Sequence, residues 1–183
     1  MSDNQQNQIS TKKEDFFYFL DTSVKTLVIM LLIFAFVLSP NTILQTSMLP
    51  TLQEENKVIV YQFMYKPKRG DIVIVTQPND MNHSLVKRVI ATGGQTVNID
   101  AVAGKVYVDD KELDEPYILE PTYVAGNIKY PFVVPEGKLF VMGDNRNVSL
   151  DSRSDRIGTI DERYIKGKVW FRIYPFNRIG VVK

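Results

Sequence analysis

The sequence contains no cysteine and a single histidine, His83. Without cysteine the chain has no thiol nucleophile, no disulfide framework and no thiolate metal site. A zinc site built on two or more imidazoles is excluded as well. His83 follows a stretch rich in Pro, Asn and Asp, residues 78–82, so we expect it to be a solvated loop residue. Acidic residues alone show no recognisable ligand spacing, and neither a metal nor a cofactor is expected.

The chain also lacks an excess of charge of either sign. Its 183 residues carry 22 Lys and Arg against 21 Asp and Glu, a formal net charge of +1. Proteins that bind nucleic acid by neutralising phosphates need a strongly basic surface. No nucleic-acid partner is therefore expected. With 44% hydrophobic residues, the chain is able to build a packed core.

One long uncharged run lies near the N-terminus. No charged residue occurs between Lys25 and Glu54, and residues 27–38 are unbroken apolar sequence. A membrane-spanning helix needs about 17–25 predominantly apolar residues. The aromatic residues 16–19 that precede the run suit the headgroup level of a bilayer. We predict a transmembrane anchor over residues 24–42.

A cleavable secretory signal is the alternative, because its apolar region of roughly 7–15 residues has a similar length. Residues 39–42 contain no small-x-small cleavage site, which favours a retained anchor. Lysines precede the run, and no Lys or Arg follows it before Lys57. The positive-inside rule then predicts a cytoplasmic tail, residues 1–23, and an extracytoplasmic domain, residues 43–183. The chain is expected to be a single-pass protein of the cell membrane, in contact with lipid.

Beyond residue 56 the sequence is typical of β-structure. Short runs of β-branched and aromatic residues alternate with clusters of Gly, Pro, Asn and Asp, as in a sandwich or barrel. These runs are residues 58–61, 71–75, 85–90, 105–108, 138–142 and 169–174. The stretch from about 100 to 135 is richer in turns and acidic residues, which indicates a small inserted subdomain. We predict a mainly β domain interrupted by this insertion.

Two side chains in the β region and before it are candidates for chemistry. Ser47 follows the predicted anchor, where composition alone indicates a polar linker. Lys87 shares a strand face with Leu85 and Val89, and burial between them would lower the pKa of its amine. To act as a base near neutral pH, that pKa must fall by about 2–3 from about 10.4. An edge-strand lysine with its ammonium in water is the ordinary alternative.

The third candidate is residues 143–153, which follow an apolar strand. This segment is dense in Asp, Arg and Ser, whose side chains are able to form ion pairs and hydrogen bonds. A surface turn is the alternative, and composition leaves the choice open.

In this order and behind an N-terminal anchor, the three segments resemble the type I signal peptidases. The resemblance runs from about residue 44 to residue 168. It rests on four motifs, each weak alone but specific together. The motifs are Ser47-Met48-x-Pro50-Thr51-Leu52, Arg69-Gly70-Asp71-Ile72-Val73, Lys87-Arg88-Val89-Ile90, and Met142-Gly143-Asp144-Asn145-Arg146 with Ser149, Asp151, Ser152 and Arg153.

The resemblance implies a serine endopeptidase that removes N-terminal signal peptides from secretory pre-proteins at the outer membrane surface. Ser47 would be the nucleophile, Lys87 the general base, and Ser149 the group that orients the Lys87 amine. Ion pairs would hold the site together through Asp144, Arg146, Asp151 and Arg153. The backbone N–H of Ser47 is the expected oxyanion donor. Substrates would carry small side chains one and three residues before the cleaved bond.

The fold implied is a signal-peptidase-like β catalytic core with a small inserted cap, preceded by one N-terminal transmembrane helix. The chain departs from the family pattern in three places, one of them a single residue and two of them short segments. Gln45 replaces the hydroxyl residue that serves some members as a second oxyanion donor, Asn147-Val148 replaces a frequent Asp-Asn, and residues 91–95 replace the usual Gly-x-Pro-Gly-Asp. These departures leave the serine and the lysine in place and bear on rate or specificity.

Two other functions compete with this one. A catalytically silent relative that binds exported chains or an assembly partner would be favoured if Ser47 or Lys87 were missing, and both are present. A self-cleaving serine–lysine protease of the repressor type shares the chemistry, but such proteins are soluble and the predicted anchor argues against it. The sequence leaves the oligomeric state and the particular pre-proteins open.

Overall fold

The computed structural model describes residues 3–78 and 84–183, with the backbone alone for residues 3–12. His83, predicted to lie in a solvated loop, is outside the described residues. The chain divides into two compact units, one ending at Leu38 and the other spanning Ser39–Lys183. Each unit is described by itself below.

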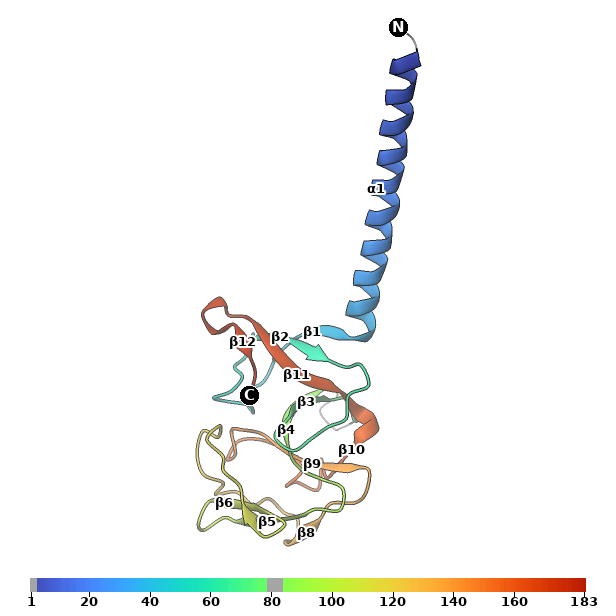
Figure 1. Ribbon diagram of the computed structural model, residues 1–183. Coiled ribbons are helices and arrows are strands. Elements are labelled where there is room, and N and C mark those ends of the chain that lie inside the picture. The colour runs from blue at the N-terminus through green and yellow to red at the C-terminus, as the bar shows by residue number, and fades with distance from the viewer. Residues whose placement is uncertain (1–2, 79–83) are drawn as a thin grey trace. The chain divides into compact units, whose positions relative to one another are not determined.

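The first unit is a single helix, α1 (Asp3–Phe36) (Figure 1). Its segment Lys13–Phe36 is long and apolar enough to cross a membrane, and the large apolar side chains along it are exposed. The helix ends at Phe36, whereas the predicted anchor continues to residue 42. Pro40 lacks an N–H and disfavours helical geometry in the residue before it. The chain instead becomes extended and forms β1 (Leu38–Thr42).

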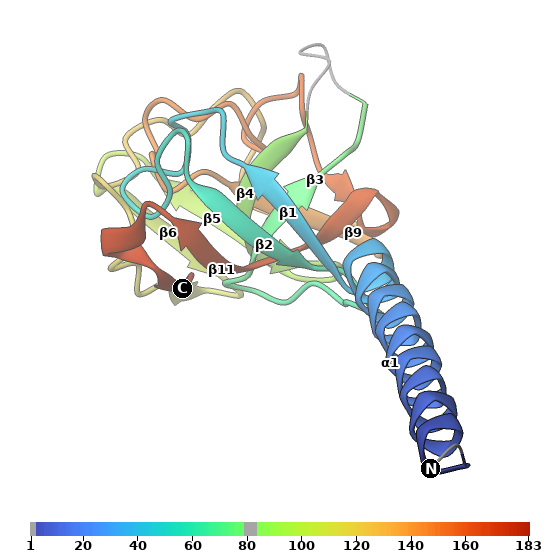
Figure 2. The same ribbon diagram turned by 90° about the horizontal axis from the view of Figure 1, so that it is seen from above.

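The larger sheet of the second unit has eight strands among the described residues. Their order is β1-β2-β11-β3-β4-β9-β10, and β12 pairs with β11. Figure 2 shows β1 and β2 running beside each other across this unit. The strands are β2 (Lys57–Tyr61), β3 (Ile72–Val75), β4 (Leu85–Thr92), β9 (Lys138–Met142), β10 (Ile160–Asp161), β11 (Ile165–Tyr174) and β12 (Gly180–Val181). Short 3-10 helices η1 (Glu162–Tyr164) and η2 (Phe176–Arg178) flank β11.

A smaller sheet, formed by residues 96–133, begins four residues before the predicted insertion, about 100–135, and otherwise lies inside it. Its order is β7-β6-β5-β8. In Figure 1 it lies beyond β9, at the far end of the second unit from β1 and β12. The strands are β5 (Thr96–Asp100), β6 (Lys105–Val108), β7 (Lys111–Glu112) and β8 (Phe132–Val133). The predicted mainly β fold is confirmed.

Strand β4 lies between β3 and β9, in the interior of the larger sheet. Six of its eight residues are buried. One face packs into an apolar cluster with β3 and β9, and Ile90 packs toward the smaller sheet. Both Lys87 and Arg88 are buried on this strand, with 1% and 2% of their surface exposed. A strand that buries two adjacent cationic residues needs specific partners for them, because an unpaired buried charge is costly.

Gly167 marks the closest approach between β11 and β2. A Cβ atom there would clash with the backbone oxygen of Tyr61 and with Val60. We predict that Gly167→Ala lowers the free energy of unfolding by about 1–3 kcal/mol, the usual cost of overpacking a core. The measurement is urea unfolding of the full chain in detergent, followed by the fluorescence of Trp170, the single tryptophan. Lys111→Ala on exposed β7 is the control and is expected to leave the midpoint in place; equal midpoints for the two variants would contradict the prediction.

Candidate active site

Ser47 lies at the start of a tight turn between β1 and β2. The turn is closed by hydrogen bonds from Leu49 N to Thr46 O (3.1 Å) and from Leu52 N to Met48 O (2.9 Å). Met48 and Leu52 are buried in the same apolar cluster as β2 and β11. Burying these two side chains fixes the turn and leaves the neighbouring Ser47 half-buried at its edge.

Lys87 reaches this turn from β4, forty residues later in the chain. Its Nζ lies 2.7 Å from Ser47 Oγ. The flanking residues on its strand face, Leu85 and Val89, are also buried. The structure therefore brings the predicted nucleophile and the predicted base into direct contact.

Burial lowers the pKa of Lys87 from its ordinary 10.5 to about 8. The carboxylates of Asp151 and Asp144 oppose this change, because a nearby negative charge favours the ammonium form. The guanidinium of Arg153 acts in the same direction as burial. With its amine neutral, Lys87 is able to accept the proton of Ser47 across the 2.7 Å contact.

Asp144 joins the turn of Ser47 to the strand of Lys87. Its carboxylate accepts two hydrogen bonds from Arg88, from Nε at 2.8 Å and from Nη2 at 2.7 Å, and both side chains are buried. The same carboxylate accepts a hydrogen bond of 2.5 Å from Thr51 Oγ1. Bidentate pairs of this kind fix orientation as well as distance. A backbone hydrogen bond also joins the loop of Asp144 to the turn of Ser47, because Asn145 N donates to Ser47 O at 3.0 Å.

Arg146 is held from the inserted region. It donates to both oxygens of Glu115, at 2.8 and 2.5 Å, and to Thr122 Oγ1 at 2.8 Å. Tyr117 lies over the guanidinium of Arg88, with 3.8 Å from Cζ to the ring centroid. We call residues 115–122 the strap, because they cross from the inserted region onto the arginines of the site.

Asp151 and Arg153 pair with each other within the loop. Arg153 Nε donates to Asp151 Oδ1 at 2.8 Å, and Nη2 donates to Oδ2 at 2.8 Å. Asp151 Oδ2 also accepts from Gly143 N at 2.9 Å, and Arg153 Nη2 donates to Arg146 O at 2.6 Å. Of the four residues expected to form ion pairs, only these two are each other's partners; Asp144 and Arg146 pair with Arg88 and Glu115.

Gly143 allows the loop to approach Ser47. A Cβ atom at this position would clash with Ser47 O and with Ser149 Oγ. The hydroxyl of Ser149 is buried and has no hydrogen-bond partner among the described residues. The structure gives the Lys87 amine a bond to Ser47, so the orienting role of Ser149 stays a prediction.

Sequence reasoning missed Arg88, Glu115, Tyr117 and Thr122 as parts of the site. A signal for Arg88 was present, because it lies in a matched motif and an arginine placed on an apolar strand face needs a carboxylate partner. Nothing local distinguishes Glu115 from the other acidic residues of the insertion, since its partner Arg146 is 31 residues away.

Two cavities border Ser47. One, of about 190 Å³, has no charged side chain in its lining among the described residues. It is lined by Asn41, Thr42, Ile43, Leu44, Gln45, Ser47, Met48, Ile74, Ser84 and Val86. The other, of about 270 Å³, is lined by Leu44, Gln45, Thr46, Ser47, Glu54, Lys87, Val148 and Leu150. Gln45, at the position of the expected hydroxyl, borders both cavities.

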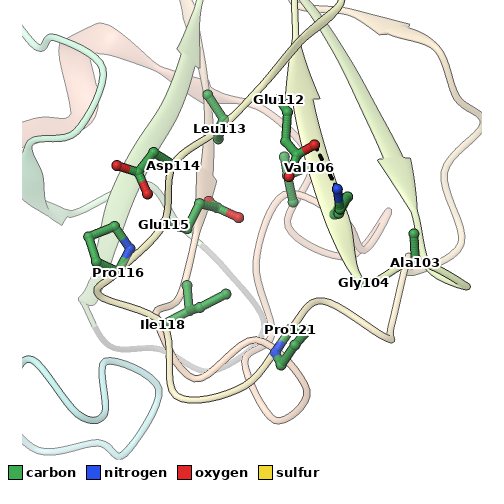
Figure 3. A pocket seen from close by; sticks show the side chains of 11 residues that line it. Ala103, Gly104, Val106, Glu112, Leu113, Asp114, Glu115, Pro116, Ile118 and Pro121 are labelled. Atoms are coloured by element: carbon green, nitrogen blue, oxygen red, sulfur yellow. Dashed lines mark hydrogen bonds and ion pairs between the residues drawn. The ribbon is translucent and has the colours of Figure 1, made fainter.

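A larger cavity, of about 610 Å³, lies in the inserted region (Figure 3). Val106 of β6 and the neighbouring Glu112 of β7 line one side, and Pro116, Ile118 and Pro121 lie across from them. Neither Ser47 nor Lys87 lines it. Despite its size, this cavity therefore does not contain the predicted nucleophile or the predicted base.

Comparison with known proteins identifies relatives over most of the chain. A family model described as signal peptidase, peptidase S26, matches residues 17–174. Signal peptidase I of Bacillus licheniformis is 37% identical over 180 residues, covering 93% of this chain and 95% of that protein. Probable signal peptidase I-1 of Synechocystis is 40% identical over 165 residues, covering 84% and 80%. A crystal structure of a signal peptidase I from Enterococcus faecalis is 28% identical, covers 57% of this chain and 97% of that chain, and has a TM-score of 0.48.

The strap gives a test of the buried ion pair. Glu115→Leu leaves the charge of Arg146 buried without its carboxylate, and we expect the free energy of unfolding to fall by about 3–5 kcal/mol. Glu112→Leu is the matched control, because Glu112 pairs with Lys105 in an exposed bridge that contributes little. Urea unfolding followed by Trp170 fluorescence measures both variants. Equal losses of stability would show that the Arg146–Glu115 pair is not a structural requirement.

Proposed function

The chain belongs to the signal peptidase family, peptidase S26, and we propose that Ser47 and Lys87 are its catalytic dyad. It is a signal peptidase I, an endopeptidase that cleaves signal peptides from secretory pre-proteins. The 2.7 Å contact between Lys87 Nζ and Ser47 Oγ is the observation that carries the assignment of the dyad. The lowered pKa of Lys87 supports the role of this residue as a base.

The reaction proceeds in two steps through an acyl-enzyme. Neutral Lys87 takes the proton of Ser47 as Oγ attacks the carbonyl carbon, and then gives a proton to the nitrogen of the leaving chain. A water molecule then attacks the ester carbonyl as Lys87 takes its proton. Lys87 passes this proton to Ser47 Oγ as the ester bond breaks, which releases the signal peptide with a free carboxyl group and restores the serine. The backbone N–H of Ser47 donates to the oxyanion, and one such donor is typically worth about 10²–10³ in kcat.

The buried ion pairs serve to position the dyad. Asp144 connects Thr51, four residues after the nucleophile, to Arg88, the residue after the base. Asp151 and Arg153 hold the loop whose glycine, Gly143, lies against Ser47 O. Because proton transfer needs a short and aligned contact, small shifts of either element would slow the reaction.

The cavity of about 190 Å³ is suited to a small substrate side chain before the scissile bond. Ile43, Met48, Ile74 and Val86 contribute apolar surface to its lining. Burial of a small apolar side chain there is favourable, whereas a charged one would lose its hydration without a countercharge. This supports the expectation of small side chains one and three residues before the bond.

We infer further that the chain is a single-pass membrane protein with its dyad outside the cytoplasm. Lys13–Phe36 would be the span. The lysines before the apolar run, and their absence after it until Lys57, support a cytoplasmic N-terminus. In this topology the residues before Lys13 lie in the cytoplasm, residues 39–183 form the extracytoplasmic part, and lipid contacts Lys13–Phe36.

The dyad is tested with the detergent-solubilised full chain and a purified pre-protein. Ser47→Ala is expected to abolish cleavage, because no acyl-enzyme forms. Lys87→Met, which keeps the volume of the side chain, is expected to lower kcat by about 10²–10⁴-fold, the usual contribution of a general base. The wild type should cut after a small-x-small site, as identified by mass spectrometry of the products. Cleavage by Ser47→Ala, or a wild-type kcat in Lys87→Met, would overturn the role of that residue, and no cleavage by the wild type would favour a silent relative.

The pKa of Lys87 predicts how activity depends on pH. The base must be neutral, and its folded-state pKa is about 8, so kcat/KM should rise with pH and level off above about 8. Below that value the rate should fall about tenfold per pH unit, because protonated Lys87 is inactive. Asp155→Asn, an exposed change at a residue that is not among the charges shifting the pKa of Lys87, should keep the same midpoint. A midpoint near 10.5 would show that the lysine is not desolvated in the working enzyme.

A further inference from the structure

We propose that Glu54 determines specificity for the substrate residues that follow the cleaved bond, and favours basic side chains there. This inference rests on the proposed function, since it concerns the same nucleophile and base. Glu54 lines the cavity of about 270 Å³ together with Ser47 and Lys87. Apart from Lys87, it is the one charged residue in that lining among the described parts of the chain.

Lys87 identifies which side of the bond this cavity receives. The base must deliver a proton to the leaving nitrogen, which belongs to the residue after the bond. Lys87 lines the cavity of about 270 Å³ and is absent from the lining of the cavity of about 190 Å³. The larger of the two therefore holds the leaving side of the substrate, and the uncharged one holds the residue before the bond.

The turn that carries Glu54 is held in place before a substrate arrives. Ile43 N donates to Asn56 O at 2.9 Å, and Glu55 N donates to Ile43 O at 2.8 Å. Asn56 is buried and accepts from Gln53 N at 3.3 Å through its side chain. Glu54 itself is exposed at the rim. Its carboxylate is thus presented to the cavity without a cost for ordering the backbone.

Two exposed apolar side chains complete the rim of this cavity. Leu44 and Val148 expose 75% and 70% of their surface and line the same cavity as Glu54. They offer surface for the methylene groups of a lysine or arginine, while the carboxylate meets the charged end. A glutamate in the same place would be repelled by Glu54.

Glu54 acts on the substrate and leaves the base unaffected. The charges that shift the pKa of Lys87 are those of Asp151, Arg153 and Asp144, and Glu54 is not among them. Changing the charge of Glu54 should therefore alter the preference among substrates while the pH midpoint of cleavage stays at about 8. A changed substrate preference with an unchanged pH midpoint assigns Glu54 to substrate specificity and not to the chemical step.

The experiment is a charge-exchange series on the detergent-solubilised full chain. Synthetic pre-protein peptides differ only in carrying Lys, Gln or Glu at the first or the second position after the bond, and kcat/KM is measured for each. Wild type is expected to prefer Lys over Glu by about 2–5-fold at low salt, the size of an exposed ion pair, and less at high salt. Glu54→Gln should remove the preference and Glu54→Lys should reverse it.

Glu55→Lys is the matched control, because it makes the same charge change in the same turn at a residue that does not line the cavity. It should keep the wild-type preference. The proposal is overturned if Glu54→Lys leaves the Lys-to-Glu ratio unchanged or if Glu55→Lys changes it equally. The Gln peptide separates this proposal from the dyad: wild type must cut it and Ser47→Ala must not, whatever the Glu54 variants do.

Discussion

The carboxylate of Asp144 is the point on which the site depends. It receives Arg88 from β4 and Thr51 from the turn of the nucleophile, two elements that are far apart in the chain. Lys87 and Ser47 are carried by the same two elements, so their contact is set largely by this carboxylate. Because the pair is buried, its desolvation cost is offset only when the geometry is good and every donor is satisfied. Arg88 meets this condition, with two bonds to Asp144, one to Gly70 O and the ring of Tyr117 over its face.

Lys87 is buried on the same strand, and burial lowers the pKa of its amine. Within residues 3–78 and 84–183, no carboxylate is bonded to its amine; Nζ has a hydroxyl partner, and burial makes the ammonium form unfavourable. Adjacent residues of one strand thus have different surroundings: Arg88 is buried with a bonded carboxylate, whereas Lys87 is buried against a hydroxyl and is the proposed base. The strands of the larger sheet pack closely around both side chains and leave 1% and 2% of their surfaces exposed. This division explains why the strand can hold two cationic residues and still be stable.

The strap makes the inserted region part of the catalytic core. Glu115 and Thr122 hold Arg146, Tyr117 covers Arg88, and Leu119 N donates to Asp144 O at 3.2 Å. The loop of residues 143–153 is therefore braced from inside by its own Asp151–Arg153 pair and from outside by the strap. An insertion that looks peripheral in sequence contributes side chains to the shell around the dyad.

The sequence by itself determined the mainly β fold, the apolar helix before it, and Ser47 and Lys87 as the residues to examine. These follow from local patterns: period-two strands, an uncharged run and four short motifs in order. The end of the helix at Phe36, the pairing of Asp144 with Arg88 and of Arg146 with Glu115, and the placement of Glu54 beside the dyad were decided by tertiary structure. A charge pattern shows which residues need partners, but many acidic residues satisfy it equally. The choice among them depends on which segments the sheets bring together, and that information is spread over the whole chain.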